Sequence, residues 1–352
     1  MAIAAADSDL SIPWWKEPTK DQWLAWIAAW LGWMLDAFDF TIFLLLMAAI
    51  ADEFQVSVTA VASVLTFTLW LRLIGAVGAG WLGDRIGRKA PLILSIIWFS
   101  ACNFIAGFSP SFTFLFVVRA ILGIGMEPAV WIENRKRQRQ EKKEVRAPLL
   151  NIFKPALLTN TLTACWWAAG FSVVYYSVNG LFATWLQTDL KLAATFVTVP
   201  IVLSNLGLLL GGALWGRIAD GIGRRHAIML QAALACVVAP VYLLTDDLIW
   251  IVVGFSIQGL FGAAMHCLSP SYLTERFPTE VRSTAVGSCY HFGLVVGGFV
   301  PMTISYFAVE QHMGFAVPML IGTVVGSVSV ILALLVSPET KGKVFVAELM
   351  KH

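Results

Sequence analysis

Long runs of apolar residues, separated by short polar stretches, follow one another along almost the whole chain. A helix needs about 20 apolar residues to cross about 30 Å of hydrocarbon. Runs of about that length cover residues 23–50, 56–82, 90–108, 112–131, 156–186, 193–216, 227–244, 248–268, 284–307 and 314–336. The pattern predicts an all-α membrane protein with about 10 transmembrane helices, tight turns and two short tails.

The composition strengthens this prediction. Hydrophobic residues make up 58% of the 352 residues and charged residues 13%, against about 25% charged in soluble domains. The 24 Lys/Arg and 22 Asp/Glu nearly cancel, so the net charge gives no reason to expect nucleic acid. The five cysteines show neither C-x-x-C nor metal-ligand spacing. We therefore expect them to pack as small apolar residues, without disulfides or a bound metal.

The basic residues predict the orientation of the helices. If the amino terminus is cytoplasmic and the runs alternate, Lys191 is the only Lys or Arg in an external loop, while Arg72 and Arg119 lie within runs. Cytoplasmic loops of membrane proteins are enriched in Lys and Arg. Both termini are therefore predicted to be cytoplasmic. Residues 1–22 lack the basic start and short apolar core of a signal peptide, so we expect the first helix to be retained.

Two predicted cytoplasmic loops share the pattern G-x-x-x-D-x-x-G-[RK]-[RK]. They are residues 80–89 (GWLGDRIGRK) and 216–225 (GRIADGIGRR), and each follows the second helix of its half. The same offset carries Gly123 onto Gly259. The chain therefore contains parallel internal repeats. Two ordinary basic loops that match by chance are the alternative.

With these loops the sequence resembles the major facilitator superfamily, whose signature loop occurs once in each six-helix half. Residues 119–125 (RAILGIG), 275–282 (ERFPTEVR) and 338–342 (PETKG) resemble further motifs of that family. Residues 35–40 (LDAFDF), with Arg72, resemble the sialate and monocarboxylate proton symporter branch. The resemblance implies a monomeric, cofactor-free, multi-pass protein of the cell membrane, most simply a bacterial inner membrane. It also implies that the signature loops form a conformational gate, with the residues Gly80, Asp84, Arg85, Gly87, Arg88, Asp220, Gly223 and Arg224.

The amino-terminal half is shorter than the family pattern. Four predicted helices follow Asp220, whereas two follow Asp84 before a basic linker opens at Glu133. Residues 119–125 run almost directly into 129–135 (AVWIENR), which resembles the family's exit from helix six. We therefore expect a major facilitator fold of four plus six helices instead of twelve, without the equivalents of helices 5 and 6.

This reading gives five segments. They are a cytoplasmic tail at 1–22, a truncated bundle of four helices at 23–131, a basic cytoplasmic linker at 132–155, a six-helix bundle at 156–336 and a cytoplasmic tail at 337–352. The linker is expected to be a solvated helix that joins the halves. A site for anionic lipid or for a protein partner is the alternative.

Four charged residues lie near the middle of predicted membrane helices, namely Asp36, Asp39, Arg72 and Arg119. Their burial costs on the order of 10 kcal/mol in total, which implies pairing, function or both. Helix rise places Asp39 near the depth of Arg119 and Asp36 near that of Arg72. Burial favours a protonated carboxylate and a neighbouring guanidinium favours the ionised form. The hypothesis is that these pairs couple transport to protons; static ion pairs that fix helix packing are the alternative.

The resemblance places the substrate next to residues 156–186, because the family's seventh helix lines the substrate cavity. Tyr175, Tyr176 and Asn179 are therefore candidate substrate contacts, with Gln258 and His291 as weaker candidates. A single buried His or Gln more often packs between helices.

The predicted function is secondary active transport, with proton-coupled uptake of an organic anion of the carboxylate, sialate or sugar-acid type. The alternatives are a porter of a sugar or an aromatic acid, or a shortened membrane protein that does not transport, as a degraded gene product or an assembly artefact would be. An enzyme is not expected, because H-E-x-x-H, G-x-S-x-G and dense Asp/His clusters are lacking.

Overall fold

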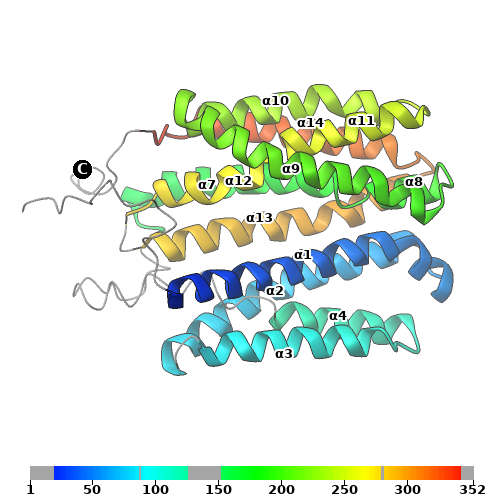
Figure 1. The fold of residues 1–352 in the computed structure, drawn as a ribbon, viewed down its shortest axis with the longest axis horizontal. Helices are drawn as coiled ribbons and strands as arrows, with labels where there is room; N and C mark the ends of the chain where they lie inside the picture. The colour runs from blue at the N-terminus through cyan, green and yellow to red at the C-terminus, as the bar shows by residue number, and fades with distance from the viewer. Residues whose placement is uncertain (1–19, 87–88, 126–151, 279–280, 342–352) are drawn as a thin grey trace, which may run out of the picture. The chain divides into compact units, whose positions relative to one another are not determined.

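The computed structural model describes residues 20–86, 89–125, 152–278 and 281–341, and these residues form helices joined by short connections (Figure 1). The elements are α1 (Lys20–Phe54), α2 (Val58–Ile86), α3 (Lys89–Ala106), α4 (Phe112–Gly125), α7 (Pro155–Val178), α8 (Phe182–Thr188), α9 (Ala194–Ile222), α10 (Arg224–Leu243), α11 (Leu248–Gln258), the π-helix η1 (Gly259–Ala263), α12 (Met265–Glu275), α13 (Arg282–Ser305), the π-helix η2 (Tyr306–Glu310) and α14 (Ala316–Leu335). Helix α1 crosses from one compact unit, which ends at Phe43, into a second, which begins at Leu44.

Seven helical stretches of the described chain are long and apolar enough to cross a membrane. They are Val58–Gly75, Pro155–Thr188, Thr195–Ile222, Arg224–Leu243, Leu248–Glu275, Thr284–Glu310 and Ala316–Leu335, and Ile93–Ala106 and Phe112–Gly125 are shorter apolar helices. Over its described residues, each predicted apolar run is mostly helical. The prediction of an all-α membrane protein is confirmed, and the count of about 10 crossings stays a prediction.

Three predicted runs are not continuous α-helices, and one of them, the run at 284–307, ends in the π-helix η2. The run at 156–186 is interrupted at 179–181 between α7 and α8, where a Cβ on Gly180 would lie 2.5 Å from the carbonyl oxygen of Tyr176. The run at 248–268 contains η1 and continues as far as Glu275. A Cβ on Gly259 of η1 would lie 2.1 Å from the carbonyl oxygen of Ser204 in α9. Small residues at these points let neighbouring backbones approach closely.

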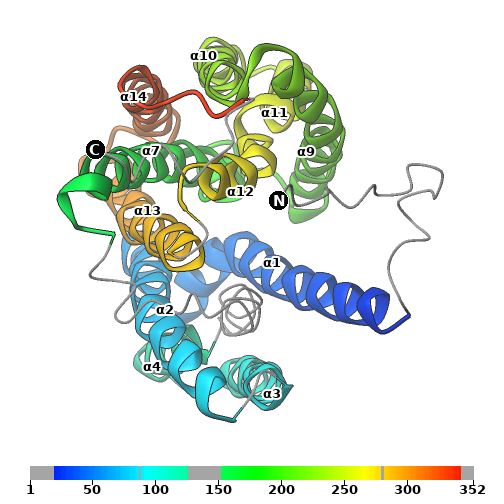
Figure 2. The same ribbon diagram turned by 90° about the vertical axis from the view of Figure 1, so that its left-hand side faces the viewer.

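Helix α13 lies between α7 and α2 in Figure 2, and polar contacts accompany its packing on α2. The Thr66 hydroxyl donates a hydrogen bond to the carbonyl oxygen of Gly298 at 2.5 Å. The indole N–H of Trp70 donates to the carbonyl oxygen of Val295 at 3.1 Å. Interhelical hydrogen bonds of this kind contribute to helix association where hydrocarbon surrounds the helices. They hold α2, from the first half of the chain, against α13, from the second.

The motif RAILGIG at 119–125 joins α4 to α2. Gly123 packs so closely on α2 that a Cβ there would lie 2.3 Å from the carbonyl oxygen of Thr68. The Thr68 hydroxyl in turn donates to the carbonyl oxygen of Arg119 at 3.1 Å. The glycine thus allows a close approach that a larger side chain would prevent.

Candidate functional site

The second signature loop is reduced to a single residue, Gly223, between α9 and α10. Its φ angle is +100°, which side chains with a Cβ rarely adopt. A Cβ at this position would also lie 2.4 Å from Oε2 of Glu339. Position 223 therefore requires glycine for two reasons: the φ angle of the turn, and the carboxylate of Glu339 packed against it.

Glu339, in the closing motif PETKG, caps the start of α10. Its carboxylate accepts hydrogen bonds from the backbone N–H groups of Arg224 at 2.9 Å and Arg225 at 3.2 Å. It also accepts from the backbone N–H groups of Thr340 at 2.9 Å and Lys341 at 3.1 Å. The first N–H groups of a helix have no partner within the helix, and the positive end of the helix dipole favours an anion there.

These contacts set the protonation of the Glu339 carboxyl. Burial alone would raise its pKa, but the hydrogen bonds from the N–H groups of Lys341, Thr340 and Arg224 outweigh burial and hold the pKa below the usual glutamate value. Glu339 is therefore an anion at neutral pH, and it contacts Nδ1 of His226 at 3.1 Å.

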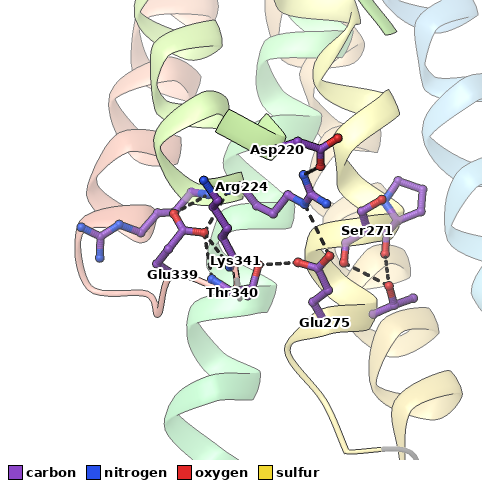
Figure 3. A network of polar contacts seen from close by, with 10 residues as sticks. Asp220, Arg224, Ser271, Glu275, Glu339, Thr340 and Lys341 are labelled. Carbon is purple, nitrogen blue, oxygen red and sulfur yellow. Dashed lines mark hydrogen bonds and ion pairs between the residues drawn. The ribbon is translucent and has the colours of Figure 1, made fainter. Parts of the chain in front are cut away.

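Arg224 connects this cap to α9 and α12, as Figure 3 shows. Its guanidinium forms an ion pair with Asp220, one helical turn before it, and donates through Nε to Oε1 of Glu275 at 3.4 Å. The other oxygen of Glu275 accepts from the hydroxyl of Thr340 at 2.5 Å. Asp220, Arg224, Glu275, Glu339 and Thr340 thus form one charge network, which joins the signature loop, the end of α12 and the closing motif.

Arg276, next to Glu275, is a second junction that the sequence did not single out. Its side chain is fully buried and donates to Oδ1 of Asn160 at 2.9 Å and to the hydroxyl of Ser337 at 3.3 Å. The guanidinium also lies 5.2 Å from the centre of the Tyr272 ring. These partners are neutral, and they tie the end of α12 to the start of α7 and to the chain just after α14. The only sequence signal was its place inside the motif ERFPTEVR.

The first signature loop does not allow the same comparison. The structure describes only the backbone of Gly80, Asp84 and Arg85. Gly87 and Arg88 lie outside the described residues. The basic linker at 132–155 also lies outside them as far as residue 151. The gate role of these residues stays a prediction.

Of the four charged residues near the middle of predicted membrane helices, the structure describes the side chains of three. Arg72 of α2 is only 9% exposed, and Arg119 of α4 and Asp39 of α1 are half-buried. The side chain of Asp36 lies outside the described residues. The pairing of Asp39 with Arg119 and of Asp36 with Arg72 stays a prediction.

The predicted substrate contacts on α7 do not share one environment. Tyr176 is buried and packs against Gly297 of α13, where a Cβ would lie 2.6 Å from its ring. Asn179 follows the last residue of α7, and its amide donates to the carbonyl oxygen of Tyr175 at 3.4 Å. Tyr175 is partly exposed, and its ring lies 5.4 Å from that of Tyr176.

Gln258 and His291 are both buried, and their role as substrate contacts stays a prediction. The amide of Gln258 lies against Gly262 of η1, and both amide atoms have no hydrogen-bond partner within the part of the chain that the structure describes. Nδ1 of His291 contacts the carbonyl oxygen of Gly287, one turn earlier in α13, at 2.8 Å. His266 of α12, which the sequence analysis did not single out, instead contacts the ring of Tyr175.

A groove of about 500 Å³ lies between α7, α13 and α14. Its lining is almost entirely aliphatic and aromatic carbon, from residues such as Val296, Val300, Ile321 and Val325. None of the predicted substrate residues lines it. This lining suits hydrocarbon, and not a carboxylate, so the groove is not the candidate substrate site.

The profile of the Major Facilitator Superfamily matches residues 29–132 and 165–348 of the chain. The match includes both signature loops, α7 from Cys165 onwards and the charge network. The chain belongs to the Major Facilitator Superfamily. It is accordingly a multi-pass membrane protein of a transporter family, as its motifs predicted.

Three relatives within this superfamily match nearly the whole chain. A probable 4-methylmuconolactone transporter of Cupriavidus pinatubonensis is 25% identical over 410 positions, which take in 94% of this chain and 93% of the relative. A cis,cis-muconate transport protein of Acinetobacter baylyi is 23% identical, with 83% and 89% covered. The sialic acid transporter NanX of Escherichia coli is 21% identical, with 96% and 98% covered.

The cap formed by Glu339 predicts a pH-dependent contribution to stability. Replacement of Glu339 by Gln is expected to lower the free energy of unfolding by about 1 kcal/mol at neutral pH, the usual value of a helix cap. The pKa of Glu339 is lower in the folded chain than in the unfolded chain. The carboxylate therefore stabilises the fold above the ordinary glutamate pKa, and this contribution is lost as the pH falls through the lowered pKa.

Thermal unfolding in detergent, followed from neutral to acid pH, measures this effect. The melting temperatures of the wild-type chain and Glu339→Gln should converge as the pH falls. Glu310→Gln, which changes an exposed glutamate at the end of η2, is the control and should unfold like the wild-type chain. A constant difference between wild type and Glu339→Gln at all pH values would show that the charge of Glu339 is not what stabilises α10.

Proposed function

We propose that the chain is built for secondary active transport of a small organic anion, driven by protons. The observation that carries this proposal is Arg72, a cation that is only 9% exposed within the candidate span Val58–Gly75. A central arginine costs about 2.5–3.5 kcal/mol on the membrane-insertion scale. Such a cation is retained where an anion binds or a carboxylate pairs with it, and its guanidinium suits a carboxylate ligand.

The relatives support an anionic substrate. Those named above are transporters of 4-methylmuconolactone, cis,cis-muconate and sialic acid. Muconate and sialic acid are carboxylates at neutral pH. We infer that this chain also recognises a carboxylate.

Proton coupling is assigned to Asp39 with Arg119, and less directly to Asp36 with Arg72. Asp39 lies on α1, and Arg119 lies on α4 at the motif that packs against α2. A carboxylate that meets a guanidinium in one state of the transport cycle and loses it in another releases and binds a proton. The charge network around Arg224 would be part of the gate, because it ties the second signature loop to the end of α12 and to the closing motif.

A second candidate, a chain that inserts but transports poorly, is favoured by the missing helix pair. The alignment with the 4-methylmuconolactone transporter runs over 410 positions, which is more than the 352 residues of this chain. The relative therefore has residues that this chain lacks. This supports the interpretation that the equivalents of helices 5 and 6 are absent.

Uptake by reconstituted liposomes tests the proposed function. Labelled cis,cis-muconate and sialic acid are supplied outside, with the interior one pH unit more alkaline. One proton per substrate supports an accumulation of about tenfold, because a tenfold ratio is worth about 1.4 kcal/mol. We expect accumulation of at least one of these acids, which a protonophore abolishes. Uptake that is indifferent to the protonophore would exclude proton coupling, and uptake of neither acid would support the second candidate.

A further inference from the structure

A histidine on α12 packs between two aromatic rings of α7. The ring centre of His266 lies 4.5 Å from that of Phe171 and 4.6 Å from that of Tyr175, with interplanar angles of 70° and 69°. Phe171 and Tyr175 are four residues apart, so they lie one turn apart on the same face of α7. We call these three residues the His266 cluster.

The cluster lies within the candidate spans Pro155–Thr188 and Leu248–Glu275. Phe171 is buried and forms its back, while Tyr175 and His266 are partly exposed and form its open side. Polar side chains inside membrane helices face a cavity or a partner, and not lipid. We take the open side of the cluster to be the side that a ligand reaches.

The backbone beside His266 is also unusual. The π-helix η1 ends at Ala263, three residues before His266, and His266 hydrogen-bonds to the backbone of Ala263. Single π-helical turns occur often at functional sites. An imidazole has two ring nitrogens, and the bond to Ala263 accounts for one of them. The second can bind an oxygen of a ligand.

We propose that the His266 cluster binds the planar, conjugated part of an unsaturated carboxylate. Flat π systems pack favourably on aromatic rings, face to face with an offset or edge to face. The imidazole adds a hydrogen-bonding group at the rim of the same surface. This inference rests on the proposed transport of an organic anion, and it narrows the substrate class.

The surroundings of the cluster disfavour a sugar acid. Val174 and Val178, which follow Phe171 and Tyr175 on the same face of α7, are apolar and buried. The amide of Asn179 donates to its own helix. A sugar acid carries several hydroxyl groups, each of which needs a hydrogen-bond partner when it leaves water. The cluster offers rings in place of such partners, so it suits a conjugated acid better than sialic acid.

Two dicarboxylates of equal length test this inference. cis,cis-Muconate and adipate each have six carbons and two carboxylates, and they differ only in the two conjugated double bonds. Each is titrated by calorimetry into the full chain in lipid nanodiscs. We expect muconate to bind about tenfold more tightly than adipate, the factor that two ring contacts supply.

Matched variants assign the preference to the cluster. Tyr175→Leu and His266→Leu should each reduce the ratio of the muconate affinity to the adipate affinity towards one. Tyr175→Phe keeps the ring and should keep the ratio. Tyr306→Leu removes an exposed tyrosine of η2 and should also keep it.

Equal affinities for muconate and adipate in the wild-type chain would overturn the inference and leave the proposed anion transport intact. A preference that survives in both Leu variants would overturn it as well. Binding of neither dicarboxylate would also overturn the inference, whereas the proposed anion transport is tested separately by the uptake of sialic acid. The wild-type ratio decides the matter even if a variant fails to fold.

Discussion

Inserting the helix pair that the family pattern predicts to be absent is expected to raise proton-driven uptake by about tenfold or more and to raise the melting temperature in detergent. The change places the corresponding segment of a full-length relative between Met126 and Glu127, where the family pattern breaks off. Loss of a buried contact surface leaves polar groups exposed to lipid, at a few kcal/mol for each unsatisfied group. Each 1.36 kcal/mol removed from the barrier of the rate-limiting step is a tenfold rate.

The internal repeat indicates which surface lacks its partner. In the first half, α2 precedes a signature loop and packs on α13 through Thr66 and Trp70. The repeat makes α9 the counterpart of α2, and it makes the fifth helix, which we predict to be absent, the counterpart of α13. The burial of α9 agrees with this. Within its most apolar 18-residue stretch 22% is buried, against 44% or more in the other candidate spans. The inserted helices should cover α9.

Uptake and thermal unfolding of the two chains, measured side by side, decide the outcome. The control carries an unrelated pair of apolar helices of the same length at the same site, and it should recover neither uptake nor stability. If the chain without the insert transports as fast as the restored chain, the absent helices are dispensable and the second candidate function is wrong.

The replacement Asp39→Asn is expected to abolish accumulation against a gradient and to leave exchange. Asparagine keeps the size and polarity of the side chain, but it cannot release a proton. With an interior one pH unit more alkaline, the restored chain should concentrate its substrate about tenfold, and the variant should reach a ratio of about one. Counterflow, in which labelled substrate outside exchanges for unlabelled substrate inside, needs no net proton movement and should persist.

A second acid on the same helix provides the control. Asp52 is exposed near the end of α1, so Asp52→Asn should accumulate substrate like the parent chain. Undiminished accumulation by Asp39→Asn would reduce Asp39 to a packing residue. Loss of both accumulation and exchange would indicate a damaged substrate site instead of lost coupling.

The sequence alone predicted the membrane class, the approximate helix positions, the family and the repeated loop. These predictions rest on local or additive properties. An apolar run long enough to span hydrocarbon must form a helix, because its backbone groups have no other hydrogen-bond partners there. The loop pattern could be recognised in the sequence because the turn needs a φ angle of +100°, which requires glycine at position 223.

The tertiary structure decided which side chains meet. Glu339 was part of a recognised motif, yet its cap on α10, 115 residues away in sequence, follows only from the packing of the closing motif against the signature loop. Arg276 and His266 gave no periodic signal, because a single polar residue in an apolar helix looks the same whether it packs or binds. Their roles depend on Asn160 and Tyr175, which α7 brings to them from more than 90 residues away. Side-chain hydrogen bonds and ring contacts act over a few ångströms, so only the packing of the helices selects them.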